Sequence, residues 1–304
     1  MIQPDTTLLL GFPDYAPQAR ALAVALGAPY AEIEVHRFPD GESRLRLPGR
    51  LPPRVILCRS LDDPNAKLVE LLIAAATARE LGARELTLVA PYLCYMRQDI
   101  AFNPGEAVSQ RIVGRWLADH FDGVISVDPH LHRVPDLVTA VPAARTLSLS
   151  AAPLLGEFAA RNFDRPLLLG PDEESAPWVE AAARAGGLQG AVAHKERHGD
   201  RSVAIRLPDV EVRDRVVVLI DDIASTGRTL ACAAGLLYAR GAVAVHALVT
   251  HALFDPDAER QLREAGVRSL HSTDSIAHPS NAIALSGLLA GGCAEICART
   301  AEET

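Results

Sequence analysis

The sequence predicts an α/β protein made of two related domains, each a mainly parallel sheet flanked by helices. Its 304 residues suit two domains of ordinary size better than one. Short β-branched apolar runs alternate along the chain with longer segments rich in Ala and Leu. Strands that are apolar without interruption are buried on both faces, as parallel strands covered by helices are.

The apolar runs define the expected strands, and the Ala- and Leu-rich segments define the expected helices. The strands are expected at Thr7–Gly11, Val55–Cys58, Leu86–Ala90, Gly123–Val127, Leu167–Gly170, Val216–Ile220 and Val243–Thr250. The helices are expected at Ala16–Leu26, Lys67–Leu81, Ala107–Asp119, Ala176–Ala185, Thr229–Arg240 and Asp257–Ala265.

One unit of this pattern occurs twice, starting at Arg54 and again at Arg215. Each copy has an apolar strand, a polar turn, an Ala-rich helix, a Gly-Ala pair and a second strand. The repeat indicates two related domains, although chance matches also occur between unrelated α/β segments.

The domain boundary is expected where this pattern is interrupted. Pro142 and Pro153 break it, together with the serines between them. We therefore expect an N-terminal domain over residues 1–146 and a C-terminal domain over residues 147–304.

The composition is that of a globular protein with an acidic balance. Apolar residues make up 49% and charged residues 22% of the chain, which argues against disorder. The formal net charge of −8 argues against binding to nucleic acid, because such surfaces depend on basic residues. Positive charge for a phosphate ester must therefore be concentrated within particular motifs.

The cysteines and the N-terminal segment bear on the cellular location. Five scattered cysteines do not form the pattern of a disulfide framework. The N-terminus lacks the basic start and long apolar segment of a signal peptide, and no apolar run approaches the length of a membrane span. These features predict a cytoplasmic protein without a membrane partner.

The most specific motif lies at residues 216–229, where an apolar strand runs into Asp221, Asp222 and a loop of small residues. The loop leads into a helix, whose first backbone N–H groups and positive dipole end stabilise an anion. Gly227 lets the backbone close around a phosphate without a Cβ clash. The two carboxylates stand where a pentose on that phosphate would place its 2- and 3-hydroxyls, or where a coordinated metal would lie. An ordinary helix cap is the alternative, but it requires fewer polar residues.

This motif resembles the binding loop of the phosphoribosyltransferase fold, which holds a ribose 5-phosphate group. The resemblance implies that ribose 5-phosphate contacts the acidic pair and the loop, namely Asp221, Asp222, Ser225, Thr226, Gly227, Arg228 and Thr229. The loop is not a Walker A loop, because the chain has no GxxxxGK[ST] run. By itself it fits either an enzyme that makes phosphoribosyl diphosphate or one that uses it.

Further segments resemble the ribose-phosphate pyrophosphokinase family in order and spacing over nearly the whole chain. The first is a turn at residues 38–42, followed by a strand-like alternation. The resemblance implies that this turn reaches ATP across a subunit contact through Phe38, Asp40, Gly41 and Glu42. Phe38 would stack on the adenine. Taken alone, the segment also fits a plain hairpin.

The second segment, Pro91–Asp99, follows an expected strand and so lies at the carboxyl edge of a sheet, where open α/β folds bind ligands. Arg97 offers a planar cation suited to phosphate oxygens, and Gln98 offers an amide. The resemblance implies that both residues bind ATP, whereas Arg97 read alone is a typical surface ion-pair partner. The next residues, Phe102–Glu106, resemble the archaeal branch of the family.

Candidate metal ligands follow two other strands. Asp128 and His130 alternate along a segment expected to be extended, so both would point to one side. Asp172 ends another strand, and residues 173–178 depart from the Gly-rich stretch of many family members. The resemblance implies that His130 binds the Mg²⁺ that carries ATP, although this ion prefers oxygen ligands to imidazole. Asp128 is a further candidate ligand, and Asp172 would approach a second Mg²⁺ or the ribose.

Lys195 and Arg197 lie in a polar stretch, residues 194–201, that is expected to form a mobile loop. Such a charge run is ordinarily solvated surface. Its Lys-x-Arg spacing nevertheless resembles the catalytic pair of the family, and the resemblance implies that both cations close over the β-phosphate and the leaving oxygen.

Together these resemblances predict a ribose-phosphate diphosphokinase with two phosphoribosyltransferase-type domains. It would transfer diphosphate from ATP to ribose 5-phosphate with Mg²⁺, as a homo-oligomer. A phosphoribosyltransferase is one alternative, but it would have no use for Arg97 and Gln98 between the other matched loops. A non-catalytic regulatory homologue is the other, but such relatives typically lose the Lys-x-Arg loop, which is matched here.

Overall fold

The computed structural model describes residues 6–131, 133–198, 202–254 and 256–302. The chain divides into two compact units: unit 1 is Met1–Leu149 with Leu285–Thr304, and unit 2 is Ser150–Ala284. The sequence places the change of domain between residues 146 and 147 and leaves the C-terminal segment in the second domain. In the structure the C-terminal segment returns to unit 1.

Each unit is built on a parallel sheet that has six strands in the described residues. In unit 1 the strand order is β2-β1-β5-β6-β7-β8. These strands are β1 (Thr7–Gly11), β2 (Tyr30–Glu32), β5 (Arg54–Cys58), β6 (Glu85–Ala90), β7 (Gly123–Val127) and β8 (Arg145–Leu149). In unit 2 the order is β10-β9-β13-β14-β15-β16. These strands are β9 (Leu167–Gly170), β10 (Gln189–Val192), β13 (Val216–Ala224), β14 (Ala244–Ala252), β15 (Val267–Thr273) and β16 (Asn281–Ile283).

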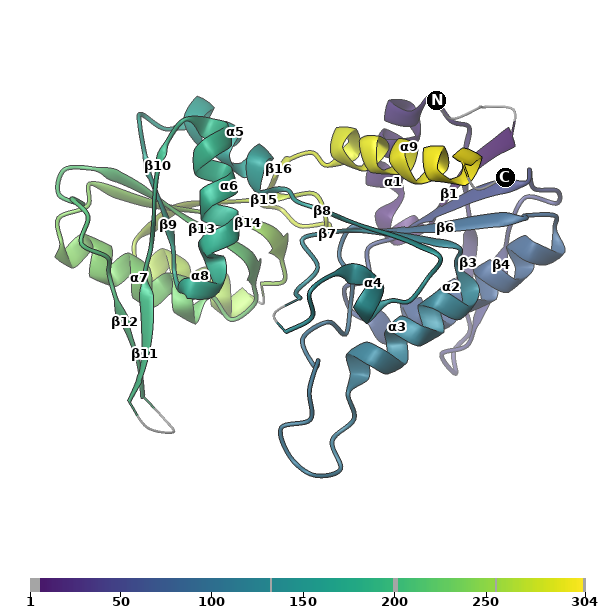
Figure 1. Ribbon diagram of the computed structural model, residues 1–304, viewed down its shortest axis with the longest axis horizontal. Coiled ribbons are helices and arrows are strands. Elements are labelled where there is room, and N and C mark those ends of the chain that lie inside the picture. Colours follow the sequence, from purple (N-terminus) through teal and green to yellow (C-terminus); the bar gives the residue numbers. More distant parts are fainter. Residues whose placement is uncertain (1–5, 132, 199–201, 255, 303–304) are drawn as a thin grey trace. The chain divides into compact units, whose positions relative to one another are not determined.

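Helices cover both faces of each sheet (Figure 1). The α-helices are α1 (Ala16–Leu26), α2 (Pro64–Glu80), α3 (Ser109–His120), α4 (Leu137–Ala140), α5 (Ala152–Asn162), α6 (Ala176–Gly186), α7 (Arg228–Ala239), α8 (Pro256–Glu264) and α9 (Ser286–Glu302). Two short 3-10 helices are η2 (Pro13–Tyr15) and η3 (Glu173–Ser175). The predicted α/β class is confirmed.

The two sheets repeat one order of elements along the chain. The strand–helix–strand unit β5–α2–β6 corresponds to β13–α7–β14, which is the repeat that the sequence predicts. Both helices are followed by a glycine with a left-handed backbone, Gly82 (φ 115°) and Gly241 (φ 89°). The prediction of two related domains is therefore confirmed.

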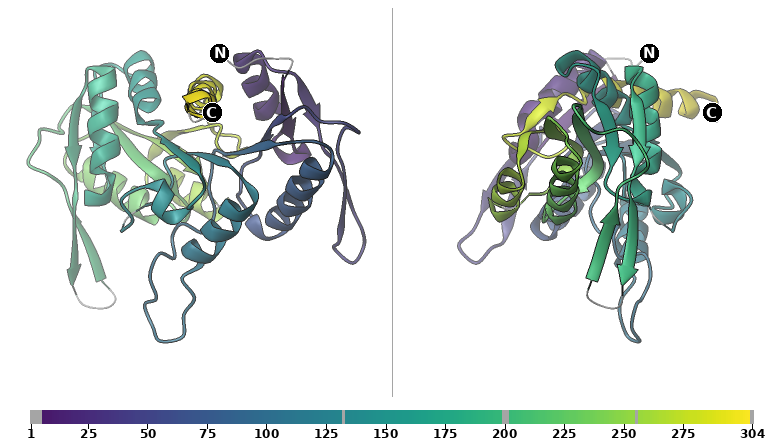
Figure 2. Two further views of the ribbon diagram at one scale, coloured as in Figure 1. Left: turned by 45° about the vertical axis from the view of Figure 1, so that its right-hand side comes forward. Right: turned by 90° about the vertical axis from the view of Figure 1, so that its left-hand side faces the viewer.

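An antiparallel hairpin is inserted at the same place in each unit, after the outermost strand (Figure 2). In unit 1 it consists of β3 (Glu34–Arg37) and β4 (Ser43–Arg46). In unit 2 it consists of β11 (His194–His198) and β12 (Ser202–Arg206). The expected loop at 194–201 is therefore wrong for its first five residues, which form a paired strand. Residues 199–201 lie outside the described part.

The apolar strands of unit 2 divide their side chains between two cores, as the period of a strand requires. Along β13, Val217 and Leu219 pack in the cluster that includes residues of α7 and α8. Val218 and Ile220 pack in the opposite cluster, with α5 and α6. Because both faces of this strand are covered, apolar residues follow one another from Val216 to Ile220 without alternating with polar ones.

Helix α9 takes in unit 1 the place that α5 takes in unit 2. It packs against α1, β7 and β8, whereas α5 packs against α6 (Figure 1). Pro153 lies in the first turn of α5, where a missing N–H costs nothing. It therefore begins a helix rather than simply interrupting the pattern.

Candidate functional site

The loop after β13 has the geometry of an anion-binding loop. Gly227 has φ 66° and precedes α7, which begins at Arg228. A Cβ on Gly227 would lie 3.3 Å from the carbonyl oxygen of Ala258 and from Leu262, so the position leaves little room for a side chain. A pocket of about 70 Å³ is lined by this loop from Asp221 onward. The backbone N–H groups at the start of α7 therefore face a space of suitable size for a phosphate.

The acidic pair lies inside β13, which continues to Ala224 instead of ending at Ile220 as expected, and it is held by the backbone. The amide of Asp222 donates to Asp221 Oδ1 (3.1 Å), and the amide of Ile223 donates to Asp222 Oδ1 (2.7 Å). Burial raises the pKa of Asp221 well above its ordinary value, and the carboxylates of Asp222 and Asp172 raise it further. A cation or a set of hydroxyl donors would offset this concentration of negative charge.

The parallel order of unit 2 brings three of the predicted segments to one edge. Strand β9 pairs with β13 on one side and with β10 on the other, and all three run in the same direction. Asp172 follows β9, Asp221 lies in the C-terminal half of β13, and the hairpin with Lys195 and Arg197 follows β10. The amide of Ala193 donates to the carbonyl of Gly170 at 2.9 Å, which joins the base of this hairpin to β9.

In unit 1, Arg97 and Gln98 follow β6 and line an open pocket of about 540 Å³. The other lining residues are Tyr92, Tyr95, Glu106, Ala107 and Ser109. Gln98 Nε2 donates to the carbonyl of Ile100 at 2.9 Å, while Arg97 is exposed. The pocket thus combines a planar cation with aromatic and polar groups.

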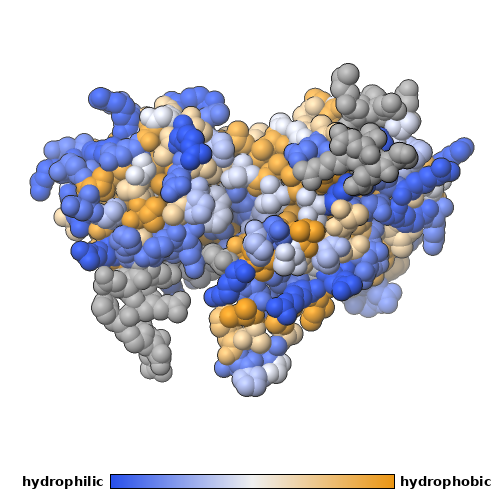
Figure 3. Space-filling view, in the orientation of Figure 1, coloured by the Kyte–Doolittle hydropathy of each residue, from blue (hydrophilic) through white to orange (hydrophobic). Residues whose placement is uncertain are grey.

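The loop beyond Gln98 is tied to neighbouring segments. Asp99, which is buried, accepts a hydrogen bond from Arg133 Nη1 at 2.8 Å. The Arg133 guanidinium also lies 5.7 Å from the ring centroid of Phe102, whose side chain is 61% exposed. Hydrophobic side chains are visible on this loop where it projects beside α3 (Figure 3).

The segment after β7 differs from the extended conformation expected of it. Asp128 has φ 38° and is buried, and its amide donates to the carbonyl of Leu149 at 2.8 Å. His130 is half-buried. A left-handed residue breaks the alternation, so the argument that Asp128 and His130 point to one side does not hold for this backbone. Neither residue lines the pocket that contains Arg97.

The predicted ATP turn at residues 38–42 closes the β3–β4 hairpin. The amide of Phe38 donates to the carbonyl of Glu42 (2.8 Å), and the amide of Gly41 donates to the carbonyl of Phe38 (2.9 Å). Gly41 has φ 93°, a conformation that favours glycine. The Phe38 ring is 39% exposed and contacts His36 edge to face, with a centroid distance of 4.8 Å. An aromatic ring is therefore presented at the tip of the hairpin.

Sequence reasoning missed the two tyrosines of the pocket in unit 1. Tyr95 has φ 61°, which is strained for a bulky residue, and its hydroxyl donates to the side chain of Asn65 in α2. Both tyrosines lie inside the segment singled out for Arg97, but nothing in the sequence reveals a left-handed backbone at a tyrosine.

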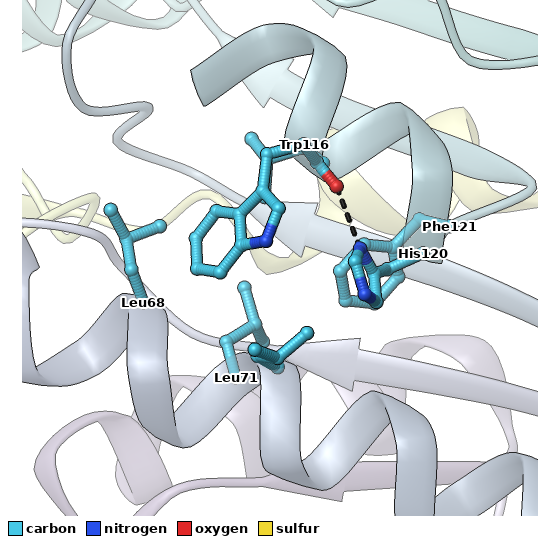
Figure 4. A pocket seen from close by; sticks show the side chains of 7 residues that line it. Leu68, Leu71, Trp116, His120 and Phe121 are labelled. Carbon is cyan, nitrogen blue, oxygen red and sulfur yellow. Dashed lines mark hydrogen bonds between the residues drawn. The ribbon is translucent and has the colours of Figure 1, made fainter. Parts of the chain in front are cut away.

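A second pocket, between α2 and α3, is apolar and small. Leu68, Leu71, Trp116 and Phe121 line it, and His120 Nδ1 donates to the carbonyl of Trp116 at 2.8 Å (Figure 4). Its volume is about 10 Å³, at the lower limit for a single water molecule. This pocket is a packing feature and lacks the convergent polar groups of a ligand site.

Comparison with known proteins identifies the family. Residues 9–120 match the model of the N-terminal domain of ribose phosphate pyrophosphokinase, and residues 204–290 match the model of the phosphoribosyl synthetase-associated domain. The ribose-phosphate pyrophosphokinase of Methanopyrus kandleri is 36% identical over 264 residues, which cover 86% of this chain and 89% of that protein. The chain belongs to the ribose-phosphate pyrophosphokinase family.

Other relatives agree with this assignment. The ribose-phosphate pyrophosphokinase of Thermococcus kodakarensis is 32% identical, with 85% of this chain and 91% of that protein covered. The crystal structure of phosphoribosylpyrophosphate synthetase from Mycobacterium smegmatis superposes with a TM-score of 0.81 over 97% of this chain and 99% of that chain. Its sequence identity of 23% supports the fold alone.

Within the described residues, none of the helices has both the length and the hydropathy that a bilayer crossing requires.

Proposed function

We propose that the chain transfers diphosphate from ATP to the 1-hydroxyl of ribose 5-phosphate, giving AMP and 5-phospho-α-D-ribose 1-diphosphate. The observation that carries this proposal is the loop at residues 221–229, in a chain of the ribose-phosphate pyrophosphokinase family. It brings the carboxylate of Asp221, a left-handed glycine and a helix N-terminus around one small pocket, and Asp222 follows Asp221 in the strand. Sugar hydroxyls suit the carboxylates, and a 5-phosphate suits the helix N-terminus.

On the acceptor side, the 5-phosphate would be held by the N–H groups and hydroxyls between Ser225 and Thr229. Asp221 and Asp222 would accept hydrogen bonds from the ribose hydroxyls. Fixing the sugar in this way converts a bimolecular reaction into one between aligned groups.

On the donor side, Arg97 and Gln98 would bind the phosphates of ATP in the open pocket of unit 1. Phe38, Asp40, Gly41 and Glu42 would supply the adenine and ribose contacts from the hairpin tip. The exposed ring of Phe38 supports a stacking role, because an apolar ring at a hairpin tip gains from a planar ligand.

The reaction would require Mg²⁺, for which Asp172, Asp128 and His130 are the candidate ligands. No cluster of three or more His, Cys, Asp or Glu residues that could hold a metal occurs in the described residues. Mg²⁺ keeps several waters and is bound through one or two carboxylates together with substrate phosphates. When bound, it would neutralise charge on the transferred phosphate oxygens.

During transfer, Lys195 and Arg197 would place positive charge on the β-phosphate and on the oxygen that leaves with AMP. Both belong to β11 and lie two positions apart. Phosphoryl transfer depends on positioning and charge neutralisation more than on covalent chemistry, so a pair of fixed cations suits the step.

We further propose that the chain acts as a homo-oligomer in the cytoplasm, with the hairpin of one subunit completing the ATP site of another. The exposed Phe38 ring at the tip of the hairpin supports a contact with another subunit. The five free cysteines support a reducing compartment.

The direct test is a reaction without any nucleobase or amine. With Mg²⁺, ATP and ribose 5-phosphate, we expect AMP and phosphoribosyl diphosphate to form in equal amounts, as chromatography of the products would show. Omission of ribose 5-phosphate or addition of EDTA should stop AMP formation. A phosphoribosyltransferase or a regulatory homologue would release no AMP from this mixture, and that result would refute the proposal.

Replacement of Gly227 tests the phosphate loop separately. A left-handed backbone costs an L-residue about 1–2 kcal/mol, so we expect Gly227→Ala to raise the KM for ribose 5-phosphate about tenfold. The KM for ATP should not change. Gly235→Ala is the matched control, because Gly235 lies within α7 with nothing near its Cβ position, and it should leave both constants unchanged. Equal KM values for ribose 5-phosphate in the two variants would contradict the assignment.

A further inference from the structure

Glu70 is a buried carboxylate that contacts both strands of the β3–β4 hairpin. It lies in α2, and its side chain is only 1% exposed. Glu70 Oε1 accepts a hydrogen bond from Ser43 Oγ at 2.7 Å and one from Arg37 Nε at 3.2 Å. Arg37 ends β3 and Ser43 begins β4, so one carboxylate oxygen fixes the two residues that flank the turn at 38–42.

The second oxygen of this carboxylate anchors Glu70 to the body of unit 1. Glu70 Oε2 accepts from Arg59 Nη2 at 2.6 Å, and the Arg59 side chain is 2% exposed. Arg59 also pairs with Asp14 at 3.1 Å and stacks over Phe12, 4.1 Å from the ring centroid. Asp14 in turn pairs with Lys67 at 3.1 Å. The carboxylate therefore connects a two-stranded hairpin, an element that is only marginally stable in isolation, to residues packed around the end of the main sheet.

The protonation state of Glu70 agrees with this geometry. Burial by itself would raise its pKa, but the hydrogen bonds from Ser43, Arg59 and Arg37 and the charge of Arg59 lower the pKa below its ordinary value. The carboxylate is therefore ionised at neutral pH and holds three donors.

Stability alone does not account for this cluster. A buried ion pair is often no more stabilising than apolar residues of the same volume, because both charges lose their hydration. What it does supply is a fixed geometry, since an unpaired buried charge is costly and alternative arrangements are therefore disfavoured. The cluster contacts the two residues that flank the turn carrying Phe38, and the proposed reaction requires this turn to have a fixed geometry.

The same helix also supports the other proposed ATP-binding segment. Asn65, in the first turn of α2, accepts the hydrogen bond from the Tyr95 hydroxyl, and Tyr95 lines the pocket with Arg97. Helix α2 thus contacts both segments through two polar side chains on its N-terminal half.

We infer that Glu70 is a positioning residue for ATP: it holds both ends of the turn at residues 38–42 in the conformation that receives the nucleotide. It does not touch the substrate itself and acts through Ser43 and Arg37. The inference rests on the proposed function, since it assigns to the turn a role in nucleotide binding.

Two substitutions test the inference. Glu70→Gln keeps the size of the side chain and removes its charge, while Ser43→Ala removes a single hydroxyl and leaves the buried Arg59–Glu70 pair intact. Hydrogen bonds to charged groups contribute about 1.5–3 kcal/mol, so we expect Glu70→Gln to raise the KM for ATP about tenfold or more, and Ser43→Ala to raise it less. The KM for ribose 5-phosphate and the kcat at saturating ATP should stay within about twofold of the original values.

Glu85→Gln is the matched control. Glu85 also bridges two arginines in unit 1, Arg54 at 3.0 Å and Arg145 at 2.9 Å. It lies at the amino end of β6, whereas the proposed ATP-binding residues Arg97 and Gln98 follow the carboxyl end of this strand. This variant should keep the KM for ATP unchanged even if its melting temperature falls. Equal KM values for ATP in Ser43→Ala and the original chain, or an equal rise in Glu85→Gln, would overturn the inference.

Hydrogen exchange gives a readout that does not depend on activity. The amides of Phe38 and Gly41 donate within the turn, and we expect them to exchange faster in Glu70→Gln and Ser43→Ala than in Glu85→Gln. If the original chain forms no AMP, the proposed function fails while the exchange data still show whether Glu70 holds the turn. If AMP forms and the exchange rates of the turn are unchanged, the positioning role is refuted and the function stands.

Discussion

Replacement of Lys195 by alanine is expected to lower kcat about 10³-fold, because removal of a fixed donor or cation from a transition state has effects of this size. The KM values should change little, since the charge of Lys195 would act on the phosphate oxygens mainly during transfer. The chain has only two lysines, Lys67 and Lys195, and otherwise uses arginine. Lys67 forms ion pairs with Asp14 and Asp62, so it cannot take over the role of Lys195 in the variant.

Arg206→Ala is the control for this experiment. Arg206 stands opposite His194 in the β11–β12 register, so its loss removes one cation from the same hairpin at the end near the sheet. We expect this variant to keep kcat within a few fold, whereas Lys195→Ala loses activity with the same melting temperature. Rapid-quench measurement of AMP formation in a single turnover would show whether the transfer step itself is slowed. Near-normal turnover of Lys195→Ala would refute the catalytic role of the Lys-x-Arg pair.

Most of the central strands were predictable because burial on both faces leaves a continuous apolar run. Strand β15 (Val267–Thr273) is also central but was not predicted, because it is partly exposed and polar residues interrupt it. The ends of β1, β7 and β9 are predicted correctly, and the ends of β5 and β6 are predicted to within one residue. The edge strands β2 and β10 were not predicted, because their residues are partly exposed and do not form such a run. Their pairing depends on the sheet beside them, which local sequence does not encode.

Helix α9 was not predicted for a different reason. It contains Gly287, Gly291 and Gly292, and glycine within a helix disfavours it by about 1 kcal/mol relative to alanine. A Cβ on Gly292 would lie 2.8 Å from a Leu149 side-chain atom, so at this position the glycine allows the helix to approach β8 closely. Tertiary packing therefore overrides the local propensity, and only the structure shows that this segment belongs to unit 1.

The candidate site was predictable where one motif carries it and not where several segments combine. The acidic pair and Gly227 could be inferred from a single run of residues, because strand, loop and helix follow one another in sequence. The proximity of Asp172 to Asp221 depends on the pairing of β9 with β13. Glu70 gives no sequence signal at all: it is one glutamate in an Ala- and Leu-rich helix, and its partners are 11 to 33 residues away.

Because Asp221 lies near Asp222 and Asp172, we expect Asp221→Asn to have opposite effects on enzymatic activity and on thermal stability. The substitution keeps an oxygen that can accept from the Asp222 amide, so the turn of the backbone should be preserved. It removes a charge that lies near Asp222 and Asp172 and is opposed by burial. In EDTA and without substrates, we therefore expect the variant to unfold at the same temperature as the original chain or at a higher one.

Activity should move in the opposite direction. A carboxylate accepts hydrogen bonds from the sugar hydroxyls, and a neutral amide accepts fewer and weaker ones, so kcat/KM for ribose 5-phosphate should fall about 100-fold. Asp257→Asn is the control, because Asp257 forms an exposed ion pair with Arg260 in α8 and should affect neither property by much. A parallel fall in melting temperature and activity would make Asp221 a structural residue. A rise in melting temperature together with a loss of kcat/KM would mean that the repulsion among these carboxylates is retained for the substrate, since a stability cost at a binding site persists only where binding requires it.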